Sequence, residues 1–213
     1  TAQGTYLVGE RRGQLNVVAW GGVVESFPNA DAAGRVVAIH LAQKPDARRV
    51  LVLGPGALAV CERFLALPQI EHVCWFHPDP GYPQALLTHM DAPGRLTGTW
   101  TERLVVPGGD VRRFLATTDE RFDLVVLNLP EATTLVLNRY STGAFFSLVD
   151  RALAPAGVVS LAIPGGENVL GQELAVLGAS ARATLRTVFE HAALKPGDRS
   201  EEHTSELQSL LII

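Results

Sequence analysis

Cysteines and long apolar runs are both scarce in this sequence. Only Cys61 and Cys74 occur among its 213 residues, too few for a disulfide framework, and we expect two buried thiols in a reducing compartment. No stretch reaches the roughly 18 to 20 consecutive apolar residues of a membrane helix, and no signal peptide opens the chain. The sequence therefore predicts a globular cytoplasmic protein, or the cytoplasmic domain of a membrane protein.

An excess of either charge is also missing. The chain has 18 basic and 22 acidic residues, a formal net charge of −4 and no long run of one sign. Proteins that hold nucleic acid by neutralising phosphates need a basic surface, so no nucleic-acid partner is expected. The histidines lack the spacing of metal ligands, no Gly-x-Ser-x-Gly motif occurs, and no His is adjacent to a cysteine. We therefore predict neither a metal site nor a catalytic nucleophile of these types.

Three parts follow one another along the chain. Residues 1–30 predict a small β-hairpin unit with a two-residue turn at Gly21-Gly22. Residues 31–198 carry the main domain. Residues 199–213 resemble a translated sequencing adapter, so we expect a non-native tail there and a main domain that is cut short at its C-terminus.

The main domain alternates predicted strands with predicted helices. Its strands are short and mostly apolar, which is typical of parallel strands buried on both faces of a sheet. We expect strands at Val50–Leu53, Val73–Phe76, Leu104–Val106, Leu124–Leu127, Val158–Ile163 and Phe189–Leu194, helices at 31–43, 58–67, 83–89, 111–117, 142–153 and 172–188, and a turn at 155–157. The pattern predicts an α/β fold whose mostly parallel, doubly wound sheet is covered by helices on both faces.

Ligands of open α/β sheets bind beyond the carboxyl ends of the strands, so the residues that leave each strand are the candidate contacts. Gly54 and Gly56 follow the first strand, where glycine lets the backbone approach a ligand and the next helix offers free N–H groups. His77 and Asp79 follow the second strand, where a nucleotide-binding protein places an acid on the ribose hydroxyls. Imidazole cannot accept two such bonds at once. Asp79 is therefore the candidate acid, although a solvated loop carboxylate fits the sequence equally well.

Asp110, Val111, Asn128 and Glu131 follow the third and fourth strands. Asp110 can accept an adenine amino proton, cap the helix that begins at Val111, or do both. Asn128 and Glu131 stand where the reacting group of an S-adenosyl-dependent transferase lies. We therefore interpret the first pair as cofactor contacts and the second pair as candidate catalytic residues.

Six short segments carry a resemblance to a known family: Gly9–Arg11, Gly13-Gln14, Gly21–Pro28, Arg112–Leu115, Thr118–Asp123 and Leu137–Tyr140. With them the chain resembles the spermidine synthase (polyamine aminopropyltransferase) family, in particular the bacterial branch fused to membrane-spanning segments. The resemblance implies a Rossmann-like fold of the class I S-adenosylmethionine-dependent methyltransferase type. It also implies transfer of an aminopropyl group from decarboxylated S-adenosylmethionine to a polyamine, a cofactor contact at Gln14, and a homodimer.

The sequence departs from the family pattern at positions that the chemistry uses. The family has an Asp-x-x-Asp pair after the fourth strand, which holds the amine and takes its proton, and Asn128 and Glu131 stand there in this chain. Asn cannot accept a proton, and loss of a general base costs about 10²–10⁴-fold in rate. His77 stands where the ribose-binding acid belongs, and the glycine-rich loop is sparser than in the family. We therefore expect a retained fold with impaired catalysis.

Three functions remain open from the sequence. They are impaired aminopropyl transfer, a non-catalytic nucleoside-binding or interaction domain of a membrane-associated protein, and methyl transfer from S-adenosylmethionine. The run Gly54-x-Gly56-x-x-Ala59 also fits a nicotinamide dinucleotide loop. That site needs an acid near the end of the second strand, where His77 stands, so it is the weaker interpretation.

Overall fold

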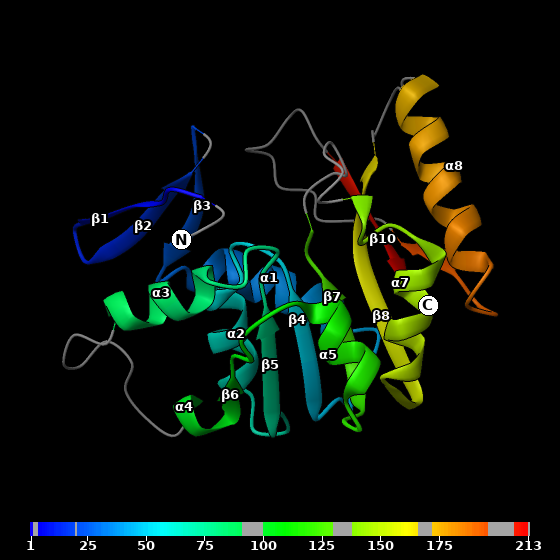
Figure 1. Ribbon diagram of the computed structural model, residues 1–213, viewed down its shortest axis with the longest axis horizontal. Helices are drawn as coiled ribbons and strands as arrows, with labels where there is room; N and C mark the ends of the chain where they lie inside the picture. Colours follow the sequence, from blue (N-terminus) through cyan, green and yellow to red (C-terminus); the bar gives the residue numbers. More distant parts are fainter. Residues whose placement is uncertain are drawn as a thin grey trace.

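Strands and helices alternate along most of the chain (Figure 1). The computed structural model describes residues 1, 4–19, 21–90, 100–129, 138–165, 172–195 and 207–212. The strands are β1 (Leu7–Arg11), β2 (Gln14–Ala19), β3 (Gly22–Phe27), β4 (Arg49–Leu53), β5 (His72–Phe76), β6 (Leu104–Val105), β7 (Phe122–Leu127), β8 (Leu153–Gly165), β9 (Ala193–Lys195) and β10 (Leu207–Ile212). The helices are α1 (Ala30–Leu41), α2 (Leu58–Leu65), α3 (Tyr82–Met90), α4 (Trp100–Arg103), α5 (Val111–Thr117), α7 (Gly143–Arg151) and α8 (Gln172–Arg186).

The first three strands form a separate antiparallel sheet in the order β1-β2-β3, drawn in blue above α3 in Figure 1. The predicted hairpin of β2 and β3 is confirmed, but Gly22 is the first residue of β3 and pairs with Ala19, so the predicted turn at Gly21-Gly22 was wrong by one residue. β1 was not predicted, because all five of its residues are exposed and it has no apolar alternation. The N-terminal unit is therefore a three-stranded meander rather than a single hairpin.

The main sheet has the order β6-β5-β4-β7-β8-β10-β9 within the described residues. β4 pairs in parallel with both β5 and β7, β5 with β6, and β7 with β8. After β4 the chain adds β5 and β6 on one side and then crosses over to β7 and β8 on the other, so the winding reverses between β4 and β7. The predicted doubly wound, mostly parallel sheet is confirmed, and its switch point lies between these two strands.

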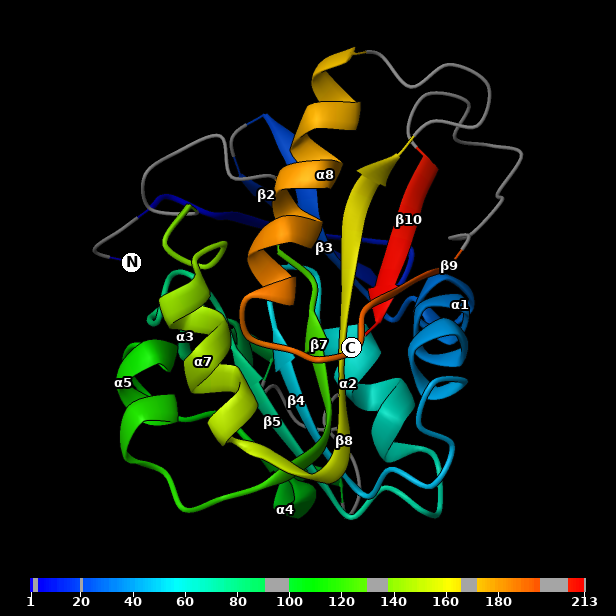
Figure 2. The same cartoon turned by 90° about the vertical axis from the view of Figure 1, so that its right-hand side faces the viewer.

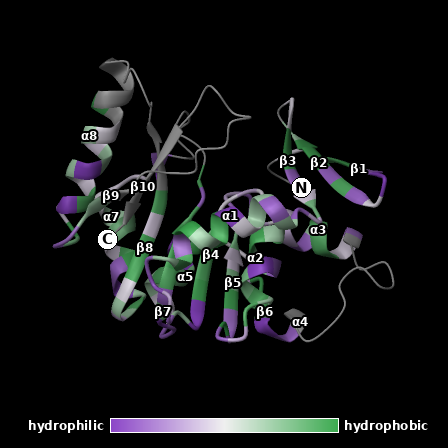
Figure 3. Cartoon of the chain, turned by 180° about the vertical axis from the view of Figure 1, so that it is seen from behind, coloured by the Kyte–Doolittle hydropathy of each residue, from purple (hydrophilic) through white to green (hydrophobic). Residues whose placement is uncertain are grey.

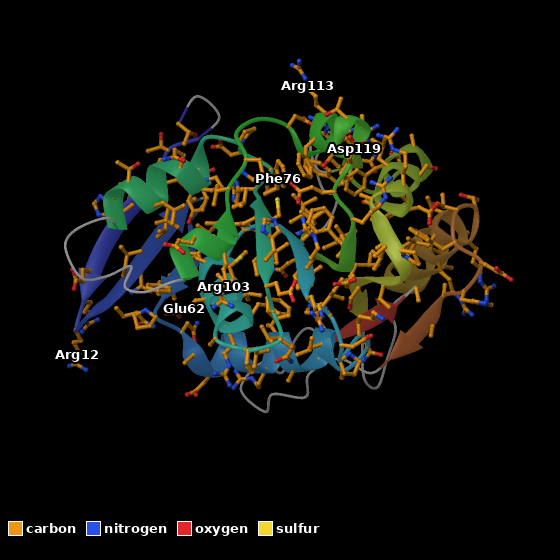
Figure 4. All side chains as sticks on the ribbon, turned by 90° about the horizontal axis from the view of Figure 1, so that it is seen from below. Arg12, Glu62, Phe76, Arg103, Arg113 and Asp119 are labelled. Carbon is orange, nitrogen blue, oxygen red and sulfur yellow. The ribbon has the colours of Figure 1, made fainter. Side chains whose placement is uncertain are left out.

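The sheet separates two apolar cores because its central strands alternate their side chains between the faces. Val50, Val52 and Trp75 pack against α1, α2 and α3, whereas Leu51 and Phe76 pack against α5, α7 and α8. Figure 2 shows helices on both faces of the sheet, and Figure 3 shows β4, β5 and β7 as mostly apolar. In Figure 4, Phe76 lies in the interior while Arg12 and Arg113 extend outward from the periphery. The core thus fixes the strand ends relative to one another.

The turn predicted at 155–157 is instead part of β8. The pairing register with β7 shifts here, from Phe122 opposite Leu153 to Leu124 opposite Val158. Ala156 has a φ of 58°, and a Cβ on Gly157 would lie 2.9 Å from the carbonyl oxygen of Phe122. The prediction of a turn was wrong because a β-bulge demands the same Gly-containing sequence as a turn.

Residues 207–212, which the sequence places in a non-native tail, form β10. This strand lies antiparallel between β8 and β9. Main-chain hydrogen bonds form a strand whatever the origin of its residues, so the interpretation of 199–213 as a tail stays a prediction. Across the part of the chain that the structure describes, no helix is both long and apolar enough to cross a bilayer.

Candidate functional site

The exits of β4 and β7 touch each other at the switch point of the sheet. Asn128 N–H donates to the carbonyl of Leu53 at 2.8 Å, and Gly54 N–H donates to the carbonyl of Phe76 at 2.9 Å. Gly54 has a φ of 145°, and a Cβ there would lie 1.7 Å from the carbonyl oxygen of Asn128. Glycine is therefore required at position 54 by the approach of the neighbouring strand, independently of any ligand.

The Asn128 side chain supports the loop after β4. Its Nδ2 donates to the carbonyl of Pro55 at 3.0 Å. This bond fixes the amide so that its nitrogen faces the loop, which leaves Oδ1 as the group that can accept a bond from another partner. Glu131, the other candidate catalytic residue, lies outside the described residues.

A buried acid that the sequence analysis did not single out lies under the same loop. Glu25 of β3 is only 2% exposed, and its Oε1 accepts the N–H of Leu58, the first residue of α2, at 3.1 Å. The N–H groups of Gly56 and Ala57 also bond to this carboxyl group. Burial raises its pKa to about 8, against the opposing effect of the bond from Leu58. Glu25 thus occupies the N-terminus of the helix that follows the glycine loop.

A phenol ring links this acid to the second strand exit. The hydroxyl of Tyr82 lies 3.5 Å from Oε2 of Glu25, and the Tyr82 ring packs 4.4 Å from that of His77, centroid to centroid. The Tyr6 ring also packs against the Tyr82 ring, with their centroids 4.6 Å apart. These rings form a continuous polar and aromatic layer between the N-terminal sheet and the main sheet.

His77 and Asp79, the candidate ribose contacts, are both buried and already bonded. The Nδ1 of His77 accepts the N–H of Asp79 at 2.9 Å, and burial lowers the pKa of His77 to about 4. Asp79 accepts the hydroxyl of Tyr6 at 2.9 Å, the N–H of Gly81 at 3.0 Å and the hydroxyl of Thr1. Burial raises the pKa of Asp79, but the bonds from Thr1 and Tyr6 outweigh it and hold the pKa below its ordinary value.

Asp110 caps α5, as one of its two predicted roles requires. Its Oδ1 accepts the N–H groups of Arg112 at 2.8 Å and Arg113 at 3.4 Å, while its Oδ2 lies 2.6 Å from Nη2 of Arg139. Val111 is 2% exposed and packs into the core. The cofactor contacts at Asp110 and Val111, including the adenine contact, stay a prediction.

Gln14, the cofactor contact implied by the resemblance, lies on β2. Its Nε2 donates to the carbonyl of Pro28 at 3.1 Å, which joins β2 to the end of the N-terminal sheet. A hollow on the exposed side of α3 is lined by Gly81, Gln84, Ala85, Thr88 and His89. Among the described residues no three His, Cys, Asp or Glu side chains gather as metal ligands would.

The histidine on α1 makes a contact that sequence spacing could not reveal. His40 and Ser160 of β8 are both buried, and His40 Nδ1 lies 2.7 Å from the Ser160 hydroxyl. Burial lowers the pKa of His40 to about 4. A pair of this kind resembles a nucleophile with its base, but its burial within the protein makes it a structural link between α1 and the sheet.

Sequence comparison finds polyamine aminopropyltransferases. Polyamine aminopropyltransferase 2 of Ralstonia nicotianae is 30% identical over 115 residues, which are 53% of this chain and 22% of that protein. Polyamine aminopropyltransferase of Mycobacterium tuberculosis is 31% identical over 123 residues, 57% of this chain and 24% of that protein. The matched region thus spans less than a quarter of these curated relatives. No protein-family model matches the chain.

Structure comparison finds spermidine synthases and a methyltransferase with a similar fold. A spermidine synthase in complex with the transition-state analogue AdoDATO has a TM-score of 0.67 at 14% identity, covering 97% of this chain and 72% of that one. A probable spermidine synthase from Corynebacterium glutamicum has a TM-score of 0.67 at 16% identity, covering 97% and 75%. Human methyltransferase-like protein 13 in complex with SAH has a TM-score of 0.57 at 17% identity, covering 86% and 81%.

The strand order, the switch point and these neighbours define a Rossmann-like α/β fold of the class I S-adenosylmethionine-dependent methyltransferase type. Within that class the chain is spermidine synthase-like, and the resemblance seen in the sequence is confirmed. The fusion to membrane segments that marks one branch of the family stays a prediction.

Proposed function

We propose that this chain is an aminopropyltransferase-like domain that binds a decarboxylated S-adenosylmethionine-type nucleoside at its strand exits and acts on a polyamine at a reduced rate. The observation that carries the proposal is the contact between Gly54 and Asn128 at the switch point, in a chain similar to polyamine aminopropyltransferases. Open α/β sheets bind their ligands at this place. Nucleic acid has no part in the proposal, and a homodimer remains an expectation from the resemblance.

The chemistry asks little of the protein beyond alignment and removal of one proton. The amine nitrogen attacks the aminopropyl carbon bonded to the sulfonium, the carbon–sulfur bond breaks, and its electron pair leaves on methylthioadenosine. The attacking amine must then lose a proton. Asn128 can orient the amine through Oδ1 but cannot take that proton, so we assign the proton to Glu131. A base that is missing or badly placed costs about 10²–10⁴-fold in rate.

A second candidate function is a non-catalytic domain that no longer binds the nucleoside. It is favoured by the state of Asp79, whose carboxylate oxygens already accept bonds from Tyr6, Gly81 and Thr1. A ribose would have to share this acid with these donors. Methyl transfer from S-adenosylmethionine uses the same fold and is the third candidate.

Calorimetry and a product assay separate these functions. The proposal expects the full chain to bind decarboxylated S-adenosylmethionine and methylthioadenosine, and to convert the former with a diamine into methylthioadenosine and a larger polyamine. Mass spectrometry of the product distinguishes the addition of an aminopropyl group from that of a methyl group. Absence of nucleoside binding up to millimolar ligand would instead support the non-catalytic domain.

A further inference from the structure

His77 is the first residue after β5, and its ring is held in one orientation. The residue is only 4% exposed. Its Nδ1 lies 2.9 Å from the backbone nitrogen of Asp79. The Tyr82 ring packs against the imidazole at 4.4 Å between centroids, and the Tyr6 ring meets it edge-on at 6.5 Å. These contacts fix which ring nitrogen faces the backbone.

The contact with Asp79 also decides which ring nitrogen carries the proton. A backbone N–H can only donate, and within the described residues the acceptor of the Asp79 N–H is Nδ1 of His77. The Asp79 carbonyl lies 3.1 Å from the same Nδ1, but it already accepts the N–H of Tyr82 at 3.1 Å. Burial lowers the pKa of His77 to about 4, so the neutral ring carries a single proton at pH 7. Nδ1 is therefore an acceptor, and Nε2 carries the proton.

The Nε2–H of His77 is the polar group that the exit of β5 leaves for a ligand. In the part of the chain that the structure describes, nothing accepts a bond from it. The neighbouring acid Asp79 is 6% exposed and already accepts bonds from Tyr6, Gly81 and Thr1. Ligands of open α/β sheets bind at such strand exits. A ligand here therefore meets a hydrogen-bond donor, at the position where the sequence analysis expects an acid.

We propose that His77 is a ligand-binding residue that donates its Nε2–H to a ribose oxygen, so that the site accepts nucleosides whose ribose hydroxyls are O-methylated. The inference rests on the proposed function and adds to it how the ribose is recognised. An acid needs the protons of the ribose hydroxyls, which O-methylation removes. A donor needs only an oxygen lone pair, which the ether oxygen keeps.

The test compares methylthioadenosine with three derivatives by calorimetry on the full wild-type chain. At least one of the 2′-O-methyl and 3′-O-methyl derivatives should bind within about threefold of methylthioadenosine, because the oxygen that accepts from His77 is still present. The 2′,3′-dideoxy derivative lacks that oxygen and should bind about 3- to 10-fold more weakly. Acid-type recognition predicts instead that both O-methyl derivatives lose at least as much as the dideoxy derivative.

Two variants of matched shape separate a donor from an acceptor at this position. His77→Gln keeps an amide N–H near the place of Nε2 and should retain the wild-type order of affinities. His77→Glu, when ionised, offers only acceptors, and both O-methyl derivatives should then bind about tenfold or more weakly than methylthioadenosine. His191→Gln changes a surface histidine and should keep all the wild-type ratios. A merely structural role of His77 would weaken all the ligands together and leave their order unchanged.

The wild-type series decides the inference even if neither His77 variant folds. If both O-methyl derivatives bind no better than the dideoxy derivative, the inference is overturned. Long-range proton–nitrogen NMR of the ligand-free protein should show the His77 proton on Nε2, and a proton on Nδ1 would also overturn it. If methylthioadenosine does not bind to wild type, the proposed function fails and the inference with it. If methylthioadenosine binds and the order of the derivatives is the acid-type one, only the inference fails.

Discussion

The side-chain amide of Asn128 donates a 3.0 Å hydrogen bond to the carbonyl of Pro55, so that the end of β7 supports the loop that follows β4. Asn128, which the resemblance places at the position of the family's catalytic acid, therefore has a structural task. Restoring the acid removes the donor and places a carboxylate oxygen opposite a carbonyl oxygen.

We expect Asn128→Asp to lower the free energy of unfolding by about 1–3 kcal/mol, because the Pro55 carbonyl loses its partner. Denaturant unfolding measures the change. Asn138→Asp alters an exposed residue in the same way and should shift stability by less than about 0.5 kcal/mol. An Asn128→Asp protein as stable as wild type would show that the bond to Pro55 contributes nothing.

Gly54 tests the contact between the two central strands. Gly54→Ala places a Cβ 1.7 Å from the carbonyl oxygen of Asn128, and the backbone must move to relieve it. We expect a loss of about 3 kcal/mol or more, or no folded protein. Gly108→Ala, where a Cβ would meet nothing within 4 Å, is the matched control and should stay within about 0.5 kcal/mol of wild type. Equal stability of both variants would contradict the strand contact.

Asp110 has two separable interactions, a cap on α5 and an ion pair with Arg139. Asn is as good an N-cap as Asp, so Asp110→Asn should lose only the ion pair between partly exposed groups, about 0.2–1 kcal/mol. Asp110→Ala should lose a further ~1 kcal/mol because the cap is gone. Thermal or denaturant unfolding gives both values. Identical losses in the two variants would mean that the cap adds no stability.

The sequence predicted the elements whose signal is local. β4, β5 and β7 are short apolar runs, and α5 begins and ends where it was expected because Asp110 caps it. β1 escaped prediction because its burial pattern carries no alternation. The sequence favours a turn at 155–157 because Gly is typical of turns and bulges alike, whereas the positive φ of Ala156 and the close approach of Gly157 to β7 appear only in the structure.

The candidate site was predicted as a set of strand exits, and the structure adds what lies across from them. Asp79 is bonded to Tyr6, 73 residues away, and Glu25 reaches Leu58, 33 residues away. Such pairs depend on how the N-terminal sheet packs on the main sheet, which no local pattern encodes. For Glu25 the sequence offered one signal. It stands two residues before Phe27 in a strand, which places both side chains on the same face of the sheet, and the structure shows that this face is buried.

His40 should make the free energy of unfolding depend on pH below pH 6.5. Burial lowers its pKa from 6.5 to about 4 beside the Ser160 hydroxyl, so the folded protein holds it neutral. The contribution of neutral His40 to the free energy of unfolding is complete above pH 6.5. It is lost as the pH falls toward 4, by at most about 1.4 kcal/mol per pH unit. His40→Gln removes this loss, so its unfolding free energy should fall less than that of wild type between pH 7 and pH 5. His191→Gln changes a surface histidine and should follow wild type. If the unfolding free energies of His40→Gln and wild type fell by the same amount between pH 7 and pH 5, the prediction would be contradicted.

Glu25 should produce the opposite dependence. Burial raises its pKa from 4.5 to about 8, so between these values the folded protein keeps a proton that the unfolded chain releases. Stability is therefore complete below pH 4.5 and falls as the pH rises toward 8, by up to about 1.4 kcal/mol per pH unit. Of the groups that face Glu25, Cys61 of α2 and Tyr82 of α3 both have a pKa raised by burial above its ordinary value, so neither titrates in this window.

Glu25→Gln cannot ionise, so the difference in unfolding free energy between it and wild type should grow in favour of the variant from pH 5 to pH 8. Glu190→Gln, which changes a carboxyl group whose side chain is 89% exposed, serves as the control in denaturant titrations at each pH. A difference that stays flat over this range would show that Glu25 ionises as easily in the folded protein as in the unfolded chain. The bonds from the three N–H groups, which favour the ionised carboxyl group, would then fully offset the effect of its burial.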